Sequence, residues 1–256
     1  MDKPTVLVTG GAKRVGEAIV RAFAAADWHV AIHFRSSDER AEELAKALPS
    51  AEAVQADFSD PGAPERLADE LAGRLSDWRV LINCASVFEP DDVRGLDRQT
   101  FAAAMRVNAL APTLLAQGFL ARARSPAGRR VIQITDQKLA NINPDFFSYT
   151  MSKAALDATI RMLAMGASRA GDRIYGLAPG AILPSHDQSA AEAETSHRLN
   201  LLQRRTRADE VAQAALFLAT GPLASGETLY LDSGQHLLDQ PRDVIYLARG
   251  EGEMRP

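Results

Sequence analysis

The sequence predicts a doubly wound α/β fold, in which seven parallel strands form one sheet with helices on both faces. Short apolar runs alternate with segments of helical periodicity, as expected for parallel strands joined by crossover helices. A glycine-rich turn also separates the first apolar run from the first helical segment. The expected strands are 5–9, 29–33, 51–55, 80–83, 130–135, 173–178 and 228–231.

The expected helices lie between these strands, near 15–26, 38–47, 62–76, 97–123, 146–170 and 208–219. No linker, repeat or low-complexity segment divides the chain, so one domain over 1–236 and a tail over 237–256 are expected. Residues 179–206 mix Pro, Ser, His and charge, and form too long a connection to be ordinary, so we expect a functional loop that closes over the substrate. The tail, with its Asp-Val-Ile-Tyr-Leu run and acidic ending, is typical of a frayed chain end.

The composition excludes several functional classes. The 256 residues are 46% hydrophobic and 24% charged, with a formal net charge of -4, which favours neither nucleic acid nor an anionic membrane as a partner. A single cysteine, Cys84, excludes a disulfide within the chain. No signal peptide or membrane-spanning run is recognisable, so a cytoplasmic protein is expected. His186 and His197 lack the paired spacing of metal ligands, so no metal is expected.

The turn at residues 9–16 reads Thr-Gly-Gly-Ala-Lys-Arg-Val-Gly and directly follows the first apolar run. Glycines let the backbone approach a phosphate, and the N-terminus of the following helix offers free N–H groups and a partial positive charge. We therefore expect Gly10, Val15 and Gly16 to bind a pyrophosphate, with Lys13 and Arg14 adding positive potential. Arg14 stands where a small residue is more usual.

The residues after the second expected strand favour NADPH over NADH. This strand end meets the adenosine ribose in a doubly wound sheet, and NAD sites place an acidic residue there. The chain instead has His33, then Arg35 and Ser36. A guanidinium and a hydroxyl bind a 2′-phosphate through charge-assisted hydrogen bonds, whereas a carboxylate would repel it. The alternative is a solvated basic residue at a strand end.

Small and polar residues follow the next two strands. Asp57 offers a carboxylate where the adenine should lie, next to Phe58. Asn83, Ala85 and Ser86 end the fourth strand, where small side chains would let the backbone pass close to the cofactor. Taken alone, each of these features is explained equally well by packing.

Tyr149 and Lys153 stand four residues apart at the start of a long predicted helix. Residues at this spacing share a helix face, so a phenol and an ammonium reach the same volume. A free phenol has a pKa near 10, and a nearby ammonium favours its ionised form. The pair therefore indicates acid–base chemistry. The alternative is an exposed Tyr and Lys on an amphipathic helix.

These motifs together resemble the short-chain dehydrogenase/reductase family over nearly the whole chain. The matching residues are Thr9, Gly10, Gly16, Asp57, Asn83, Ala85, Asn108, Tyr149, Lys153, Pro179, Gly180, Asp232 and Gly234. The resemblance implies a Rossmann-type domain and an NADP-dependent oxidoreductase. It makes Tyr149 the proton donor and Lys153 the residue that holds the nicotinamide ribose and lowers the tyrosine pKa. It makes Asn108 the residue that positions a water for the proton relay.

The same resemblance implies which residues contact the cofactor. These are Gly10, Lys13, Arg14, Val15, Gly16, His33, Arg35, Ser36, Asp57, Phe58, Asn83, Ala85, Ser86, Thr135, Lys153, Pro179 and Gly180. The alanine-rich stretches 110–123 and 154–170 match helices that form subunit interfaces in the family. A homotetramer or homodimer is therefore expected by resemblance.

One departure from the family pattern narrows the range of expected substrates. Asp136 stands where the family usually has a serine that donates to a substrate carbonyl. An ionised carboxylate only accepts hydrogen bonds, which suits a substrate with ring nitrogens. With Arg14 in the glycine turn and Phe88 after the fourth strand, the chain resembles pteridine and dihydromonapterin reductases, in which an aromatic residue stacks on the pterin. Cys84, Val87 and Ser233 depart from that pattern.

The expected reaction is NADPH-dependent reduction of a C=N bond in a dihydropterin such as dihydrobiopterin or dihydromonapterin. Its expected substrate-contacting residues are Arg14, Ser86, Phe88, Asp136 and Tyr149. Two alternatives stay open. A generic carbonyl reductase would need a protonated Asp136, which burial can produce. An NADP-binding sensor without turnover would bind the cofactor and oxidise none of it.

Overall fold

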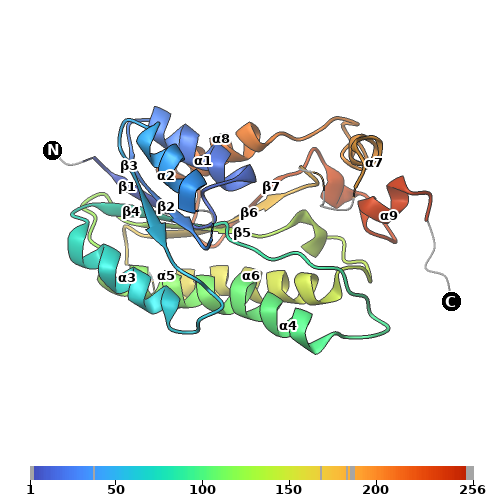
Figure 1. Ribbon diagram of the computed structural model, residues 1–256, viewed down its shortest axis with the longest axis horizontal. Coiled ribbons are helices and arrows are strands. Elements are labelled where there is room, and N and C mark those ends of the chain that lie inside the picture. Colours follow the sequence, from blue (N-terminus) through green and yellow to red (C-terminus); the bar gives the residue numbers. More distant parts are fainter. Residues whose placement is uncertain (1–2, 37, 168, 183, 185–187, 252–256) are drawn as a thin grey trace.

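The computed structural model describes residues 3–36, 38–167, 169–182, 184 and 188–251. Seven strands form one parallel sheet in the order β3-β2-β1-β4-β5-β6-β7 (Figure 1). The order reverses between β1 and β4, which is the arrangement of a doubly wound fold. The strands are β1 (Thr5–Val8), β2 (His29–Phe34), β3 (Ala51–Gln55), β4 (Trp78–Asn83), β5 (Arg130–Ile134), β6 (Arg173–Pro179) and β7 (Thr228–Leu231).

Helices cover both faces of the sheet, as predicted (Figure 1). One face packs against α1 (Arg14–Ala25), α2 (Asp38–Lys46) and α8 (Ala208–Thr220). The other face packs against α3 (Ala63–Arg74), α5 (Ala111–Arg122) and α6 (Phe147–Gly166). In β1, Val6 and Val8 enter the first core and Leu7 enters the second. Burial on both faces explains why the central strands read as continuous apolar runs.

The expected helix over 97–123 is interrupted. It consists of α4 (Arg98–Ala104), a π-helical turn (Met105–Leu110) and α5. Pro112 lacks the N–H that an α-helix would direct to the carbonyl of Asn108, so the regular hydrogen-bond ladder cannot pass this point. Wider turns of this kind often occur at functional sites, and this one carries the fully buried Asn108.

A helix forms in each of two regions for which the sequence predicts none, residues 179–206 and the tail. Within 179–206 lies α7 (Ala190–Ser196), which begins with a capping box between Ser189 and Glu192. Residues 183 and 185–187, including His186, lie outside the described residues.

The prediction of a frayed tail is wrong for the described part of the tail. Helix α9 (Val244–Ala248) begins at Asp243, whose carboxylate accepts from Ile245 N at 3.1 Å. Val244 and Ile245 are buried, and Arg249 pairs with Glu192 of α7 at 2.8 Å. Two short 3-10 turns, Gln137–Leu139 and Gln235–Leu237, complete the elements. Within the described residues, no helix combines the length and apolarity needed to cross a membrane.

Candidate active site

A cavity of about 560 Å³ lies at the carboxyl ends of the central strands. The glycine turn before α1, the ends of β4, β5 and β6, and the first turn of α6 form its walls. Helix α7 and the residues around the start of α9 close the remaining side. Residues expected at the site that line it are Gly10, Lys13, Arg14, Val15, Gly16, Ala85, Ser86, Phe88, Thr135, Asp136, Tyr149, Lys153, Pro179 and Gly180.

The glycine turn has the shape that a pyrophosphate needs. Gly10 has a φ of +64°, and a Cβ added there would lie 3.0 Å from Ala85 Cα. A Cβ on Gly16 would lie 2.2 Å from the Gly10 oxygen, which no side chain could tolerate. Thr9 Oγ1 accepts from the N–H groups of Cys84 and Ala85, at 2.9 and 3.0 Å. The turn is thereby fixed to the end of β4, and it fits a dinucleotide whose phosphates lie at the N-terminus of α1.

His33 and Phe58 lie beneath this turn. The His33 ring accepts from Gly10 N at 3.1 Å through Nδ1, so its Nε2–H donates to Ala56 O at 3.0 Å. It stacks on Phe58 with 4.3 Å between ring centroids. Both side chains are buried, and neither is among the described residues that line the cavity. They therefore support the turn from below, whereas the sequence led us to expect both at the cofactor.

We expect acidification to destabilise the protein through His33. Burial lowers the pKa of His33 to about 4, from an ordinary value near 6.5. Between these pH values the unfolded chain therefore binds more protons at His33 than the folded protein does. The contribution of His33 to the free energy of unfolding is fully present above pH 6.5 and is lost as the pH falls to 4. The contribution is about 3 kcal/mol. Denaturant unfolding across this pH range should show a smaller slope of stability with pH in His33→Gln than in the wild type.

The control for this experiment is Tyr175→Phe, which removes one hydrogen bond of a buried side chain but no group that titrates between pH 4 and 6.5. That variant should keep the wild-type slope. Equal slopes for wild type and His33→Gln would contradict the assignment of acid sensitivity to His33.

Four further residues expected at the cofactor lie outside the described lining of the cavity. Arg35 and Ser36 are exposed at the end of β2, where a ribose phosphate could reach them from solvent. Asp57 is half-buried and accepts from Ser59 N at 2.9 Å, which lowers its pKa. Asn83 is buried, and its Nδ2 donates to Gln133 Oε1 at 2.9 Å. Asn83 therefore joins β4 to β5.

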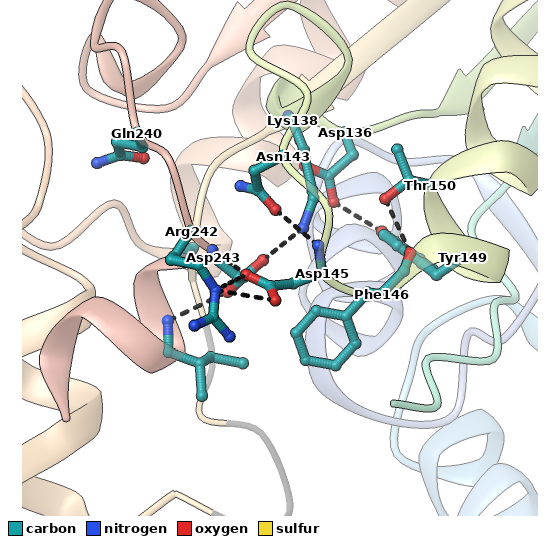
Figure 2. Close-up of polar contacts among 12 residues, drawn as sticks. Asp136, Lys138, Asn143, Asp145, Phe146, Tyr149, Thr150, Gln240, Arg242 and Asp243 are labelled. Carbon is teal, nitrogen blue, oxygen red and sulfur yellow. Dashed lines mark hydrogen bonds and ion pairs between the residues drawn. The ribbon is translucent and has the colours of Figure 1, made fainter. Parts of the chain in front are cut away.

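Tyr149 and Asp136 form a hydrogen-bonded pair in the cavity wall. The Tyr149 hydroxyl donates to Asp136 Oδ2 at 2.7 Å (Figure 2). Burial raises the pKa of Tyr149 well above 10, and the adjacent Asp136 raises it further. Burial also raises the pKa of the Asp136 carboxyl, against the backbone N–H of Lys138 and the Tyr149 hydroxyl, which lower it. The phenol is therefore neutral and carries the proton that a donor needs.

Lys153 bonds the end of β5 and lies beside Tyr149. Its Nζ donates to Ile134 O at 2.8 Å and lies 5.7 Å from the centroid of the Tyr149 ring. Burial lowers the pKa of Lys153. We expected the ammonium to lower the pKa of Tyr149, but in this structure that pKa is raised, by burial and by the Asp136 carboxyl. Lys153 still lines the cavity, one helical turn from Tyr149.

Asn108 anchors the strand end that carries Phe88. Its Oδ1 accepts from Val87 N at 2.8 Å, and its Nδ2 donates to Val87 O at 2.9 Å and Ser152 Oγ at 3.0 Å. The asparagine is fully buried, so its side chain joins the segment after β4 to helix α6. This arrangement fixes the spacing between Phe88 and Tyr149.

Phe88 and Arg14 both line the cavity. Phe88 stacks on Phe146 at 4.2 Å and meets the edge of Tyr149 at 4.7 Å, between ring centroids. Arg14 has a left-handed φ of +56° and is exposed; its Nη2 donates to Pro184 O at 3.2 Å. Arg14 thus joins the glycine turn to the segment after β6. Ser86 is exposed at the cavity and donates to Asn108 Oδ1 at 3.1 Å.

Sequence reasoning missed part of the site. Lys138, Asp243, Val244 and Ile245 also line the cavity. The one available signal was the Asp-Val-Ile-Tyr-Leu run in the tail, in which an aspartate precedes apolar residues as an N-cap does.

The fold and the site together define a class of protein. A glycine turn that fits a dinucleotide lies beside a neutral tyrosine and a lysine at the carboxyl edge of a parallel sheet. This is the arrangement of a nicotinamide-dependent oxidoreductase. A family model described as enoyl-(acyl carrier protein) reductase matches residues 10–236, and the chain belongs to the short-chain dehydrogenase/reductase family.

Proteins that are similar to this chain in sequence or structure bear the names of reductases. A granaticin polyketide synthase ketoacyl reductase from Streptomyces violaceoruber is 28% identical, covering 93% of this chain and 98% of its own. A dihydromonapterin reductase from Escherichia coli O6:K15:H31 is 26% identical, covering 91% and 96%. The crystal structure of FolM alternative dihydrofolate reductase 1 from Brucella canis, complexed with NADP, is 33% identical with a TM-score of 0.86, covering 92% and 94%. The chain is an NADP-dependent oxidoreductase.

Proposed function

We propose that this protein is an NADPH-dependent reductase of a dihydropterin, such as dihydromonapterin or dihydrobiopterin. The observation that carries the proposal is the partly buried hydrogen bond from the Tyr149 hydroxyl to the Asp136 carboxyl. A carboxyl group at this position can accept from the N–H groups of a pterin ring. The names of the Escherichia coli and Brucella canis relatives support the same substrate class.

Several residues would hold the cofactor. The turn from Gly10 to Gly16 would hold its pyrophosphate, and Lys153, which lines the cavity, would hold the nicotinamide ribose. Arg35 and Ser36, exposed at the end of β2, would bind the 2′-phosphate. When bound, NADPH supplies the hydride that reduces the C=N carbon.

The chain's own residues would supply the proton. Tyr149 would donate its hydroxyl proton to the adjacent ring nitrogen, and Lys153 would stabilise the tyrosinate that remains. Asp136, which accepts from that hydroxyl, would pass a proton taken up from solvent to the tyrosinate, and burial aids this uptake by raising the pKa of its carboxyl. Phe88 would contact one face of the ring.

A second candidate function is carbonyl reduction. A protonated Asp136 carboxyl could donate to a ketone oxygen as a serine does, and burial raises the pKa of this carboxyl. The name of the Streptomyces violaceoruber relative is consistent with this reaction.

The test follows nicotinamide absorbance with purified protein, NADPH or NADH, and three substrates: dihydromonapterin, dihydrobiopterin and an acetoacetyl thioester. We expect turnover of the pterins with NADPH, and slower turnover with NADH. Turnover of the thioester alone would overturn the proposal in favour of carbonyl reduction. Binding of NADPH with no oxidation of it by any substrate would instead indicate a sensor.

A further inference from the structure

The C-terminal segment, residues 242–246, lies against the residues that flank Asp136 and Tyr149 (Figure 2). Arg242 bonds Asp145, 97 positions earlier, and Asp243 bonds Lys138, 105 positions earlier. The ionic groups of these contacts are almost entirely removed from solvent. This segment therefore belongs to the wall of the active site and has a defined position there.

The first contact holds the start of helix α6. The buried carboxylate of Asp145 accepts from Arg242 Nε at 3.0 and 2.8 Å and from Asp243 N at 2.8 Å. The next residue, Phe146, has a left-handed φ of +52° and stands at the N-cap of α6. Such a backbone conformation is costly for a non-glycine residue, so its surroundings must hold it. Tyr149 follows within the first turn of this helix.

The second contact reaches the other member of the catalytic pair. Lys138 Nζ donates to Asp243 Oδ2 at 3.0 Å, and the backbone N–H of Lys138 donates to Asp136 Oδ1 at 2.8 Å. Asp136 Oδ2 accepts from Tyr149. Each oxygen of Asp136 thus accepts one hydrogen bond, and the orientation of its carboxyl depends on a turn that Asp243 holds.

Apolar contacts reinforce these ionic ones. Ile245 is buried with Phe146 and Tyr149 in one cluster, against which Phe88 and Tyr246 pack. The Arg242 guanidinium lies 4.5 Å from the centroid of the Tyr246 ring. The same segment therefore contacts Tyr149 through packing and Asp136 through Lys138.

We propose that Arg242 and Asp243 are positioning residues that hold the Asp136–Tyr149 pair in the geometry for proton delivery. Arg242 acts through Asp145 and the first turn of α6, and Asp243 acts through Lys138. The inference rests on the proposed function to the extent that it takes Tyr149 as the proton donor.

The effect of the Asp243 charge on the pKa of Tyr149 provides a readout that is specific to the positioning role. The ionisable groups that face the Asp136–Tyr149 pair are Lys153 of α6, Cys84 after β4, Lys138 of the 3-10 turn and Asp243 before α9. Burial and Asp136 contribute most to the raised pKa of Tyr149, and the Asp243 carboxylate raises it further. Removing the charge of Asp243 should therefore lower the pKa of Tyr149. The alkaline limb of the kcat profile, where a tyrosine donor is lost, should then move to lower pH.

The experiment compares Asp243→Asn with Asp172→Asn. Asp172 pairs with Arg129 in an ion pair that is at least as buried and lies outside the described lining of the cavity. Both variants should lower the Tm, because each leaves a buried cation without its carboxylate. Asp243→Asn alone should lower kcat by about tenfold with a smaller change in KM, and should move the alkaline limb to lower pH. Asp243→Glu should recover part of the lost kcat.

The proposal would be overturned if Asp243→Asn and Asp172→Asn had the same kcat, the same KM and the same position of the alkaline limb of kcat against pH. A structural role alone predicts that result. If Asp243→Asn does not fold, Lys138→Met/Asp243→Leu replaces both charges with apolar groups and avoids an unpaired buried charge. That double variant should fold and still show the lower kcat; wild-type kcat in it would overturn the proposal.

One measurement is independent of the substrate. Tyrosinate absorbance titrated with pH, in pairs of proteins with and without Tyr149→Phe, gives the pKa of Tyr149 by difference. The pKa should be lower in the Asp243→Asn background than in the wild type, and an unchanged pKa would count against the charge effect of Asp243. Failure of the protein to reduce any pterin would overturn the proposed function and leave this titration valid.

Discussion

Replacing Tyr149 with phenylalanine is expected to lower kcat by a factor of about 10² to 10⁴, the usual contribution of a positioned acid. A phenol with an ordinary pKa near 10 is already protonated at neutral pH, and burial and Asp136 raise the pKa of Tyr149 further. Phenylalanine keeps the ring that packs against Phe88 and removes only the hydroxyl. Single-turnover kinetics with NADPH and dihydromonapterin would measure the loss at the chemical step.

The control for Tyr149→Phe is Tyr175→Phe. Tyr175 is fully buried in β6, and its hydroxyl donates to Leu223 O at 2.6 Å. Each variant loses one hydroxyl bond, at a cost of about 1 kcal/mol in stability. Only the Tyr149 variant should lose turnover, and both should bind NADPH. A Tyr149→Phe enzyme with wild-type kcat would exclude Tyr149 as the donor.

The fold could be predicted because each strand and helix leaves a local signal. The expected strands all form, and they lie in one parallel sheet as the alternation of strands and helices predicted. The π-helical turn at Met105–Leu110 was not predicted, because its apolar residues fit an uninterrupted α-helix equally well. The proline that breaks the ladder at position 112 was visible, but prolines are also common in the first turn of a helix.

The site was only partly predictable, for a different reason. The glycine turn and the pair Tyr149 and Lys153 are local patterns, so the sequence alone places them at strand and helix ends that meet. The contribution of Asp243 depends on a contact across 105 positions, and no local pattern encodes such a contact. His33 shows a second limit. Its strand position was predicted, but whether a strand-end side chain turns outward or beneath the glycine turn depends on packing.

Replacing Asp136 with serine should separate the two candidate reactions. For pterins, kcat/KM should fall by about 10², because an acceptor built into a buried site would be lost and ring N–H groups would be left unpaired. Reduction of an acetoacetyl thioester should be retained or improved, since a serine hydroxyl can donate to a carbonyl oxygen. Asp157→Ser, a half-buried aspartate farther along α6, is the control and should leave both activities unchanged.

The pH dependence of activity in Asp136→Ser provides a second test of the role of Asp136. The Asp136 carboxyl raises the pKa of Tyr149 both by its charge and by accepting the hydroxyl proton. Without it, the pKa of Tyr149 should fall, and the alkaline limb of the remaining activity should move to lower pH. Unchanged pterin turnover in Asp136→Ser would show that the carboxyl does not contribute to substrate recognition. The hypothesis that this cavity binds a pterin would then lose its main support, because Asp136 is the residue that distinguishes this site from the site of a carbonyl reductase.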